Sequence, residues 1–124
     1  MRLLLDTHLL LWALARPSKL SAAARRQIDS ADVYVSAASI WEISIKTALG
    51  KLVANPSEVL EAIEPAGFSM LSITGQHAAK VAELPALHKD PFDRMLVAQA
   101  SVEPMILLTN DDALAAYGSF VMLS

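Results

Sequence analysis

The chain contains no cysteine among its 124 residues, which excludes disulfide bonds and any zinc site that depends on thiolate ligands. Its four glycines are scattered, so neither a G-x-G-x-x-G nor a Walker phosphate loop is present. A serine elbow of the G-x-S-x-G type is missing as well. Ten lysines and arginines against thirteen acids give a net charge of −3, without a basic tail or arm. This balance weighs against nucleic-acid binding by simple electrostatic attraction.

The chain also lacks a long uninterrupted apolar run. The stretches Leu3–Leu5 and Leu9–Ala15 follow Arg2 as in a signal peptide, but Asp6 and His8 interrupt them, and the run is too short to span a bilayer. We therefore expect a cytoplasmic protein without a membrane segment. With 54% hydrophobic and 19% charged residues the chain can form a solid core, and residues 1–124 are expected to form one domain.

Short apolar runs alternate with segments of helical periodicity along the whole chain. Strands are expected at residues 2–6, 32–35, 67–71, 105–108 and 119–123, because such runs are typical of strands in a buried sheet. Helices are expected at 9–15, 21–30, 37–49, 58–64, 74–84 and 113–117, with another beginning at residue 91. His77 is expected on the protein surface. This alternation predicts an α/β fold with a mainly parallel sheet.

The most informative segment is the helix start near residue 90. Asp90 has the features of an N-cap and Pro91 those of the first helical residue, which places Asp93 at the third helical position. Asp93 then shares a face with the apolar residues three and four positions further on. An ionised carboxylate there is costly unless it is paired, hydrogen-bonded or bound to a metal. An acid at this position would also suit the helix dipole or close a capping box, so both roles stay open.

Three further acids stand at comparable places, and each also has an ordinary structural explanation. Asp6 ends the first strand, where open α/β sheets bind their ligands, but it could simply cap the following helix. Asp111 follows another buried strand and could likewise be a cap. Glu42 projects from a helix, where an ion pair with Lys46 four residues on would account for it.

One explanation covers all four acids: Asp6, Glu42, Asp93 and Asp111 form a carboxylate cluster at the switch point of the sheet. Clustered carboxylates repel one another, so such a site needs a cation. Ligands that are all oxygen favour Mg²⁺ or Mn²⁺ over zinc. The natural chemistry is phosphodiester hydrolysis, in which one or two metal ions activate water and stabilise charge on the phosphate.

Four segments of the sequence resemble a known family. Leu4–His8, Ser39–Ile43, His88–Arg94 and Leu108–Asp111 are similar, in order and at the expected separations, to the successive motifs of PIN-domain ribonucleases. The similarity is greatest to the VapC toxins of bacterial type II toxin–antitoxin pairs, and it covers essentially the whole chain. It implies a single PIN domain over residues 1–124 with an α/β/α sandwich fold. It also implies Mg²⁺- or Mn²⁺-dependent endoribonuclease activity.

The resemblance also implies roles for the acids. Asp6, Glu42 and Asp93 take the places of the core acidic metal ligands of the family. Asp111 takes the fourth and more variable place, although the neighbouring Asp112 could hold it instead. All four acids are therefore expected to act both as catalytic residues and as metal ligands.

The residues beside the acids are expected to support them. Thr7 and Thr109 would orient carboxylates from outside the ligand set. Asp90 matches the family motif but is expected to be a helix cap, and His8 is given no catalytic role. Arg94 could contact phosphate, but a pair with Asp90 is the favoured expectation.

The partners that the resemblance implies are an RNA substrate (tRNA, rRNA or mRNA), a cognate antitoxin that blocks the site, and a second copy in a homodimer. Scattered basic residues could seat the RNA, namely Arg25, Arg26, Lys46, Lys51 and Lys89. Because the chain is acidic overall, its intrinsic affinity for RNA is expected to be modest and sensitive to salt.

Three alternative functions remain open. A stand-alone PIN nuclease would have the same site without an antitoxin, and a non-catalytic binding module would keep the fold alone. A phosphoacceptor receiver domain also gathers acids at strand ends, but it requires paired acids after its first strand and a lysine after a late one. Here Thr7 and His8 follow Asp6, and residues 109–112 include no lysine.

Overall fold

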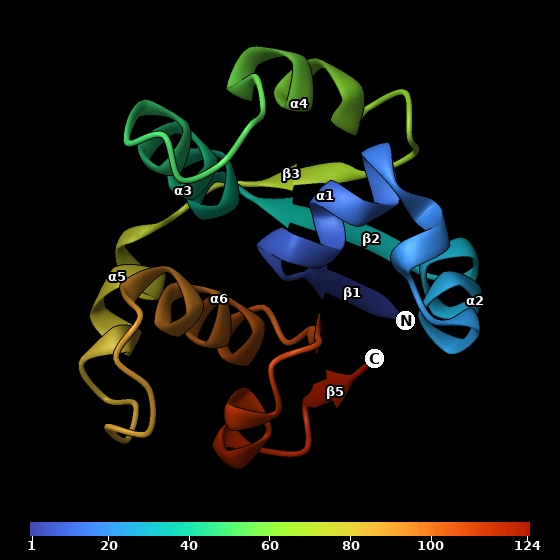
Figure 1. Ribbon diagram of the computed structural model, residues 1–124. Coiled ribbons are helices and arrows are strands. Elements are labelled where there is room, and N and C mark those ends of the chain that lie inside the picture. The colour runs from blue at the N-terminus through green and yellow to red at the C-terminus, as the bar shows by residue number, and fades with distance from the viewer.

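The computed structural model describes residues 1–124 and contains one five-stranded sheet in the order β3-β2-β1-β4-β5 (Figure 1). Every neighbouring pair of strands is parallel, which confirms the predicted α/β fold and makes the sheet wholly parallel. The strands are β1 (Arg2–Leu5), β2 (Asp32–Ser36), β3 (Ser69–Leu71), β4 (Ile106–Thr109) and β5 (Val121–Leu123).

Six α-helices and two short 3₁₀ helices connect the strands. The helix expected at 9–15 begins earlier, because Asp6 caps it, and the one expected at 58–64 begins earlier because Asn55 caps it. None of the helices is both long enough and apolar enough to cross a membrane. The helices are α1 (Thr7–Ala15), η1 (Pro17–Lys19), α2 (Ala22–Ser30), α3 (Ala37–Ala48), α4 (Pro56–Ile63), α5 (Gly75–Val81), α6 (Pro91–Val102) and η2 (Asp112–Tyr117).

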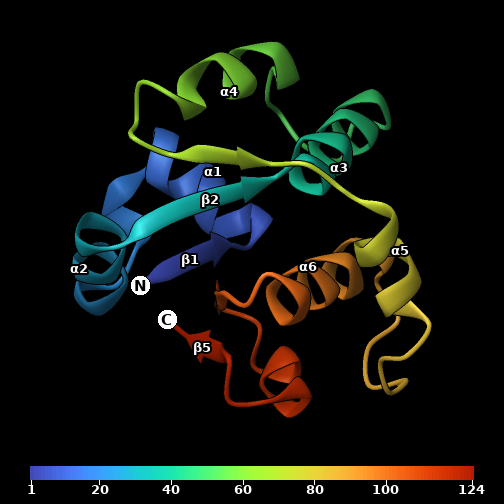
Figure 2. The ribbon, with the colours of Figure 1, turned by 180° about the vertical axis from the view of Figure 1, so that it is seen from behind.

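The core lies on both faces of the sheet. Leu3, Leu4 and Leu5 of β1 are completely buried, and the alternation of the strand sends Leu4 to the face opposite the other two. Leu3 and Leu5 pack with side chains from α1, α2, α3 and α4, whereas Leu4 packs with α6 and η2. The view from behind shows β2 and β3 in front of α1 (Figure 2). The result is the expected α/β/α sandwich.

The order of the strands creates a switch point between β1 and β4. From β1 the chain first builds β2 and β3 on one side, and it then crosses to the other side to build β4 and β5. Leu5 is in register with Leu108, and the Asp6 N–H donates to the Leu108 carbonyl at 3.0 Å. The first residues after β1 therefore lie beside the end of β4, at the edge where open parallel sheets bind ligands.

His77 lies inside the protein, so the expectation that it is a surface residue is wrong. Its side chain is completely buried, and Nδ1 accepts a hydrogen bond from the Thr74 N–H at 3.0 Å. Nε2 lies 2.6 Å from Glu103 Oε2, which satisfies the other ring nitrogen. The partner stands 26 residues further along the chain, so the local sequence around α5 could not indicate the burial.

Candidate active site

A cavity of about 470 Å³ opens at the carboxyl edge of the sheet. All four acids that the sequence analysis selected line it, and only one of its ten lining residues is hydrophobic. Asp112 is not among them, so Asp111 is the acid of this pair that faces the cavity. The lining residues are Asp6, Thr7, His8, Trp12, Glu42, Lys46, Asp90, Asp93, Asn110 and Asp111.

Asp6 is held through both of its carboxylate oxygens. Oδ1 caps α1 by accepting hydrogen bonds from the N–H groups of His8 at 2.8 Å and Leu9 at 3.2 Å. Oδ2 accepts a hydrogen bond from the Thr109 hydroxyl at 2.6 Å. The residue as a whole is 4% exposed. The capping role and the cavity-facing position, which the sequence analysis treated as alternatives, therefore coexist in one residue.

Glu42 is buried although it lies on a surface helix. The Thr7 hydroxyl donates to Oε1 at 2.7 Å, and the Lys46 ammonium donates to Oε2 at 2.5 Å. The expected ion pair with Lys46 is thus present, but at a side chain that is only 6% exposed. The hydrogen bond with Glu42 raises the pKa of Lys46, against the opposing effect of its partial burial, and the nearby acids add to this increase.

Asp93 differs from the other three acids because its carboxylate accepts no hydrogen bond. The capping role belongs to Asp90, whose Oδ1 accepts from the N–H groups of Phe92 and Asp93 at 2.8 and 3.2 Å. The Asp90 N–H in turn donates to Nδ1 of His88 at 3.1 Å, so Asp93 closes no capping box. Burial raises the pKa of Asp93 from 3.8 to about 7, with a further contribution from three neighbouring carboxylates.

Asp111 is oriented both by the helix that it caps and by a histidine. Its Oδ1 caps η2, and its Oδ2 lies 3.1 Å from Nε2 of His88. The same Nε2 lies 3.7 Å from Oδ2 of Asp93. Because Nδ1 of His88 accepts the Asp90 N–H, a neutral His88 carries its proton on Nε2 and donates it to Asp111.

The donor set fits a divalent metal ion. One atom each of His88, Asp93 and Asp111 lies within 4.8 Å of the others, a spacing that suits metal ligands. The protonated Nε2 makes His88 a hydrogen-bond donor here, which leaves carboxylate oxygens, the ligands that suit Mg²⁺ or Mn²⁺. Burial raises the pKa of Asp93 most, and the negative charges of Asp90, Asp6 and Glu42 raise it further. A divalent cation would balance these negative charges.

Comparison with known proteins identifies the family of this chain. Residues 3–119 match the sequence profile of the PIN domain, a span that includes all four acids. The chain belongs to the PIN domain family. No curated protein matches this PIN domain by sequence.

Solved structures share the PIN fold at low sequence identity. A chain of VapBC2 from Rickettsia felis, bound to a DNA fragment from its promoter, has a TM-score of 0.72 and 15% identity, with 100% of this chain and 98% of that chain covered. A chain of VapBC from Salmonella typhimurium, bound to DNA, has a TM-score of 0.68 and 16% identity, with 100% of this chain and 97% of that chain covered. A chain of FitAcB from Neisseria gonorrhoeae has a TM-score of 0.66 and 22% identity, with 98% of this chain and 95% of that chain covered. At these identities the likeness shows a common fold.

Arg94 does not pair with Asp90 in this PIN domain, so that expectation is wrong. Its guanidinium donates to the carbonyl of Pro85 at 2.9 Å, to that of Val81 at 2.9 Å and to the Tyr117 hydroxyl at 3.0 Å. These contacts join α6 to the end of α5, to the loop between these two helices and to η2. Arg94 is therefore a structural residue, held by partners that its neighbours in sequence do not reveal.

Sequence reasoning missed Trp12, which lines the cavity, and His88, which contacts the cavity residue Asp111. His88 stands two positions before the Asp90 cap, close enough for its ring to accept the cap N–H, and this spacing could have indicated an oriented imidazole. Its contact with Asp111, 23 residues away, has no local signal. Trp12 was assigned only to an apolar helix, and nothing in its surroundings in the sequence indicated that it lines a cavity.

Proposed function

We propose that this PIN domain is a Mg²⁺- or Mn²⁺-dependent endoribonuclease that hydrolyses phosphodiester bonds in RNA. The observation that carries the proposal is the convergence of four carboxylates on one cavity, in which burial and like charge raise the pKa of Asp93 to about 7. An acid that served only as a helix cap would make hydrogen bonds to the helix, and Asp93 makes none.

In this proposal Asp6, Glu42 and Asp93 hold the metal directly, and Asp111 does so directly or through water. When bound, the metal would activate the attacking water and stabilise the charge that develops on the phosphate. The hydroxyls of Thr109 and Thr7 hold the carboxylates of Asp6 and Glu42 in place, at 2.6 and 2.7 Å.

Two cationic or donor groups assist this arrangement. Lys46 neutralises part of the charge on Glu42, to which it donates at 2.5 Å. His88 donates from Nε2 to Asp111 and lies 3.7 Å from Asp93, so it keeps these two acids near each other without acting as a base. The proposal therefore assigns the activation of water to the metal.

The proposal extends to the partners of the protein. We infer that it is the toxin of a type II toxin–antitoxin pair, that a cognate antitoxin blocks the cavity, and that two copies form a homodimer. The fold shared with chains of VapBC and FitAcB, and with a toxin–antitoxin complex from Klebsiella pneumoniae, supports the antitoxin. Trp41 and Leu49 are 59% and 63% exposed on and beside α3, which supplies apolar surface for a second copy.

The test combines metal binding with RNA cleavage. Mn²⁺ and Mg²⁺ are titrated into the pure protein by calorimetry, and total cellular RNA is then incubated with the protein in each metal and in EDTA. Wild type is compared with Asp93→Asn and Asp111→Asn, and Asp112→Asn is the matched control because this neighbouring acid does not line the cavity. We expect wild type and Asp112→Asn to bind metal and cut RNA, and both cavity variants to lose these properties.

The products distinguish this chemistry from metal-free cleavage. Attack by water leaves no 2′,3′-cyclic phosphate, whereas attack by the RNA's own 2′-hydroxyl does. A folded wild-type protein that neither binds metal nor cuts RNA would contradict the proposal and favour a non-catalytic binding module. Cleavage that persists in EDTA, or that leaves cyclic phosphate ends, would contradict the metal-dependent mechanism.

A further inference from the structure

One side of α1 carries an aromatic and basic series that the proposed chemistry does not use. His8 and Trp12 lie four residues apart on α1, and Arg16 follows four residues later as the C-cap of the helix. Lys19 of η1 places Nζ 5.9 Å from the centroid of the Trp12 ring. The rings of His8 and Trp12 lie 6.4 Å apart. All four residues line one groove of about 450 Å³. We call these four residues the α1 ridge.

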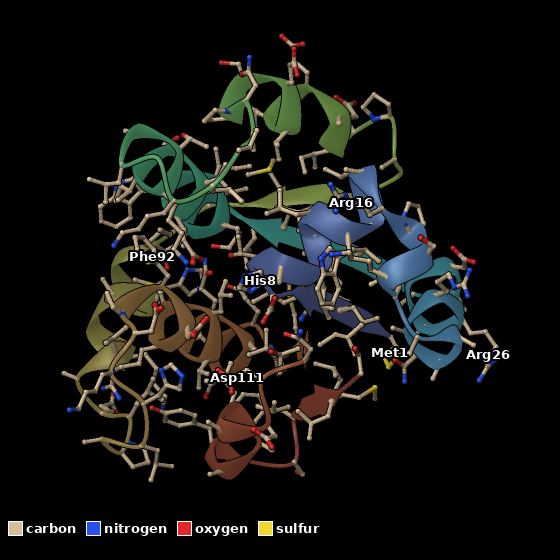
Figure 3. The ribbon with its side chains drawn as sticks, viewed as in Figure 1. Met1, His8, Arg16, Arg26, Phe92 and Asp111 are labelled. Carbon is tan, nitrogen blue, oxygen red and sulfur yellow. The ribbon has the colours of Figure 1, made fainter.

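The α1 ridge begins at the acidic cavity. His8 and Trp12 line both the cavity and the groove, so the two are continuous. Trp12 is the single hydrophobic residue in the cavity wall. Asp6 caps the same helix two residues before His8. Figure 3 shows His8 and Arg16 at opposite ends of α1, with His8 nearer to Asp111. The ridge therefore extends away from the acids for about 12 Å, the length of eight helical steps.

The chemistry of the ridge complements that of the cavity. The cavity presents mainly carboxylates, which repel RNA everywhere except at a bound cation. A substrate must therefore gain its affinity from neighbouring surface. Aromatic rings stack unpaired bases of any sequence, and lysine and arginine bind backbone phosphates. The exposed side chains of Arg16 and Lys19 supply the positive charge that the chain as a whole, with a net charge of −3, lacks.

We propose that the α1 ridge binds single-stranded RNA beside the acidic cavity, with one unpaired base against Trp12 and adjoining phosphates on Arg16 and Lys19. This inference rests on the proposed nuclease function, and it assigns residues outside the acidic cluster to substrate binding. A base within a duplex has both faces stacked on its neighbours and cannot lie against the indole.

The groove has a second wall, which is apolar and includes Leu52 and Val59. A protein segment would also fit such a wall. The observations favour RNA for the ridge side, because two cations and two aromatic rings lie together there and lead directly into the cavity. A protein that uses the same four residues is the alternative outcome of the test.

The first experiment measures base stacking. The variant Trp41→Phe removes the other tryptophan, so its fluorescence reports Trp12 alone. A short unpaired RNA and its duplex form are titrated in EDTA, where no hydrolysis takes place and repulsion from the acids acts equally on all variants. We expect the unpaired RNA to quench Trp12. Trp12→Leu in the otherwise native protein should weaken binding of unpaired RNA about tenfold, the loss typical of one stacked base.

Trp12→Phe controls for folding, since it keeps a ring of similar character and should retain most of the affinity. Circular dichroism checks that each variant is folded. Binding of the duplex should change less than about twofold in Trp12→Leu, because the duplex offers no base to stack.

The second experiment measures phosphate contacts through salt dependence. For single strands each lost contact lowers the slope of log K against log salt by about 0.7. We expect Arg16→Gln and Lys19→Gln each to lower the slope by this amount. Arg26→Gln is the matched control. The sequence analysis counts Arg26 among the basic residues that could seat RNA, but this exposed residue lies on α2, well away from Asp111 in Figure 3. Its slope should equal that of wild type.

The outcomes separate this inference from the proposed function. If wild type cuts RNA but Trp12→Leu and Arg16→Gln keep wild-type affinity and salt slope, the inference is wrong and the nuclease proposal stands. If the same variants lose binding to a cognate antitoxin while RNA binding is unchanged, the ridge is a protein-binding surface, which also overturns it. If wild type neither binds nor cuts RNA, both proposals fail.

Discussion

Replacing Asp93 with asparagine should stabilise the metal-free protein above neutral pH. The pKa of Asp93 is about 7 in the folded protein and 3.8 without the fold, because burial and neighbouring carboxylates disfavour its ionised form. Between these two pH values the folded state holds a proton that the unfolded state has lost. The contribution of Asp93 to the stability of the folded state is therefore most favourable below about pH 4, becomes less favourable as the pH rises to about 7, and changes little above it.

The size of the effect follows from the same pKa. The gap between 3.8 and about 7 corresponds to at most about 4 kcal/mol, since each pH unit is worth about 1.4 kcal/mol. The Asp93 side chain keeps 20% of its exposure, so water screens part of this penalty. We expect Asp93→Asn to raise the free energy of unfolding by about 2 kcal/mol at pH 8 and to leave it almost unchanged at pH 4.

The assay is urea unfolding in EDTA at pH 4 to 8, with Glu58→Gln as the matched control. Glu58 also stands at the third helical position, after the Asn55 cap and Pro56, but its side chain is exposed. It should act as an ordinary acid at a helix start, so its replacement should lower the free energy of unfolding by about 0.3–1 kcal/mol.

The sign of the change decides between the two roles of Asp93. If Asp93 serves only the helix dipole, Asp93→Asn destabilises the protein at pH 8 in the same way as Glu58→Gln, and our reasoning is refuted. If it belongs to a charged cluster, the variant is more stable than wild type in EDTA. Mn²⁺ should then stabilise wild type and leave the variant unchanged, because binding to the folded state alone shifts the unfolding equilibrium.

Three further changes test the supporting residues. Thr109→Val removes the hydroxyl that donates to Asp6, and it should cost about 1–3 kcal/mol in urea unfolding and about tenfold in Mn²⁺ affinity. Unchanged metal affinity would contradict the orienting role. His88→Ala should lower Mn²⁺ affinity about tenfold by releasing Asp111, and His88→Gln, which keeps a donor, should recover most of it; nitrogen NMR should find the proton on Nε2. Arg94→Met should lower the free energy of unfolding by about 2 kcal/mol without changing metal affinity, and an equal loss of metal binding would argue against its structural role.

The sheet and the helix starts were predictable because their causes are local. The apolar runs of β1 and β4 require burial on both faces of the sheet. Sheets that are buried on both faces are typically parallel. Ser21, Ser36 and Asp90 cap the helices that the sequence assigns to them, since a cap needs only the backbone of the next few residues. Once the strands are parallel, the residues after β1 and β4 must lie at one edge.

The remaining features depend on contacts between distant parts of the chain. The burial of His77 requires Glu103, and the orientation of His88 toward the cavity requires Asp111. Arg94 reaches Tyr117 and the loop before α6 rather than the acid four residues before it. Residue types and spacings cannot specify such pairs, because each polar side chain has several partners of equal chemical quality within reach once the fold is formed.

The capping and cluster roles of the acids are linked by the architecture itself. In a parallel sheet each strand ends where the next helix begins, so Asp6 and Asp111 cap α1 and η2 at the same edge where a ligand would bind. Helix N–H groups stabilise their negative charge, and Lys46 does so for Glu42. Asp93 receives no hydrogen bond, because Asp90 takes the donors at the start of α6. The uncompensated charge of the cluster therefore falls on Asp93, which is where a bound cation would have its largest effect.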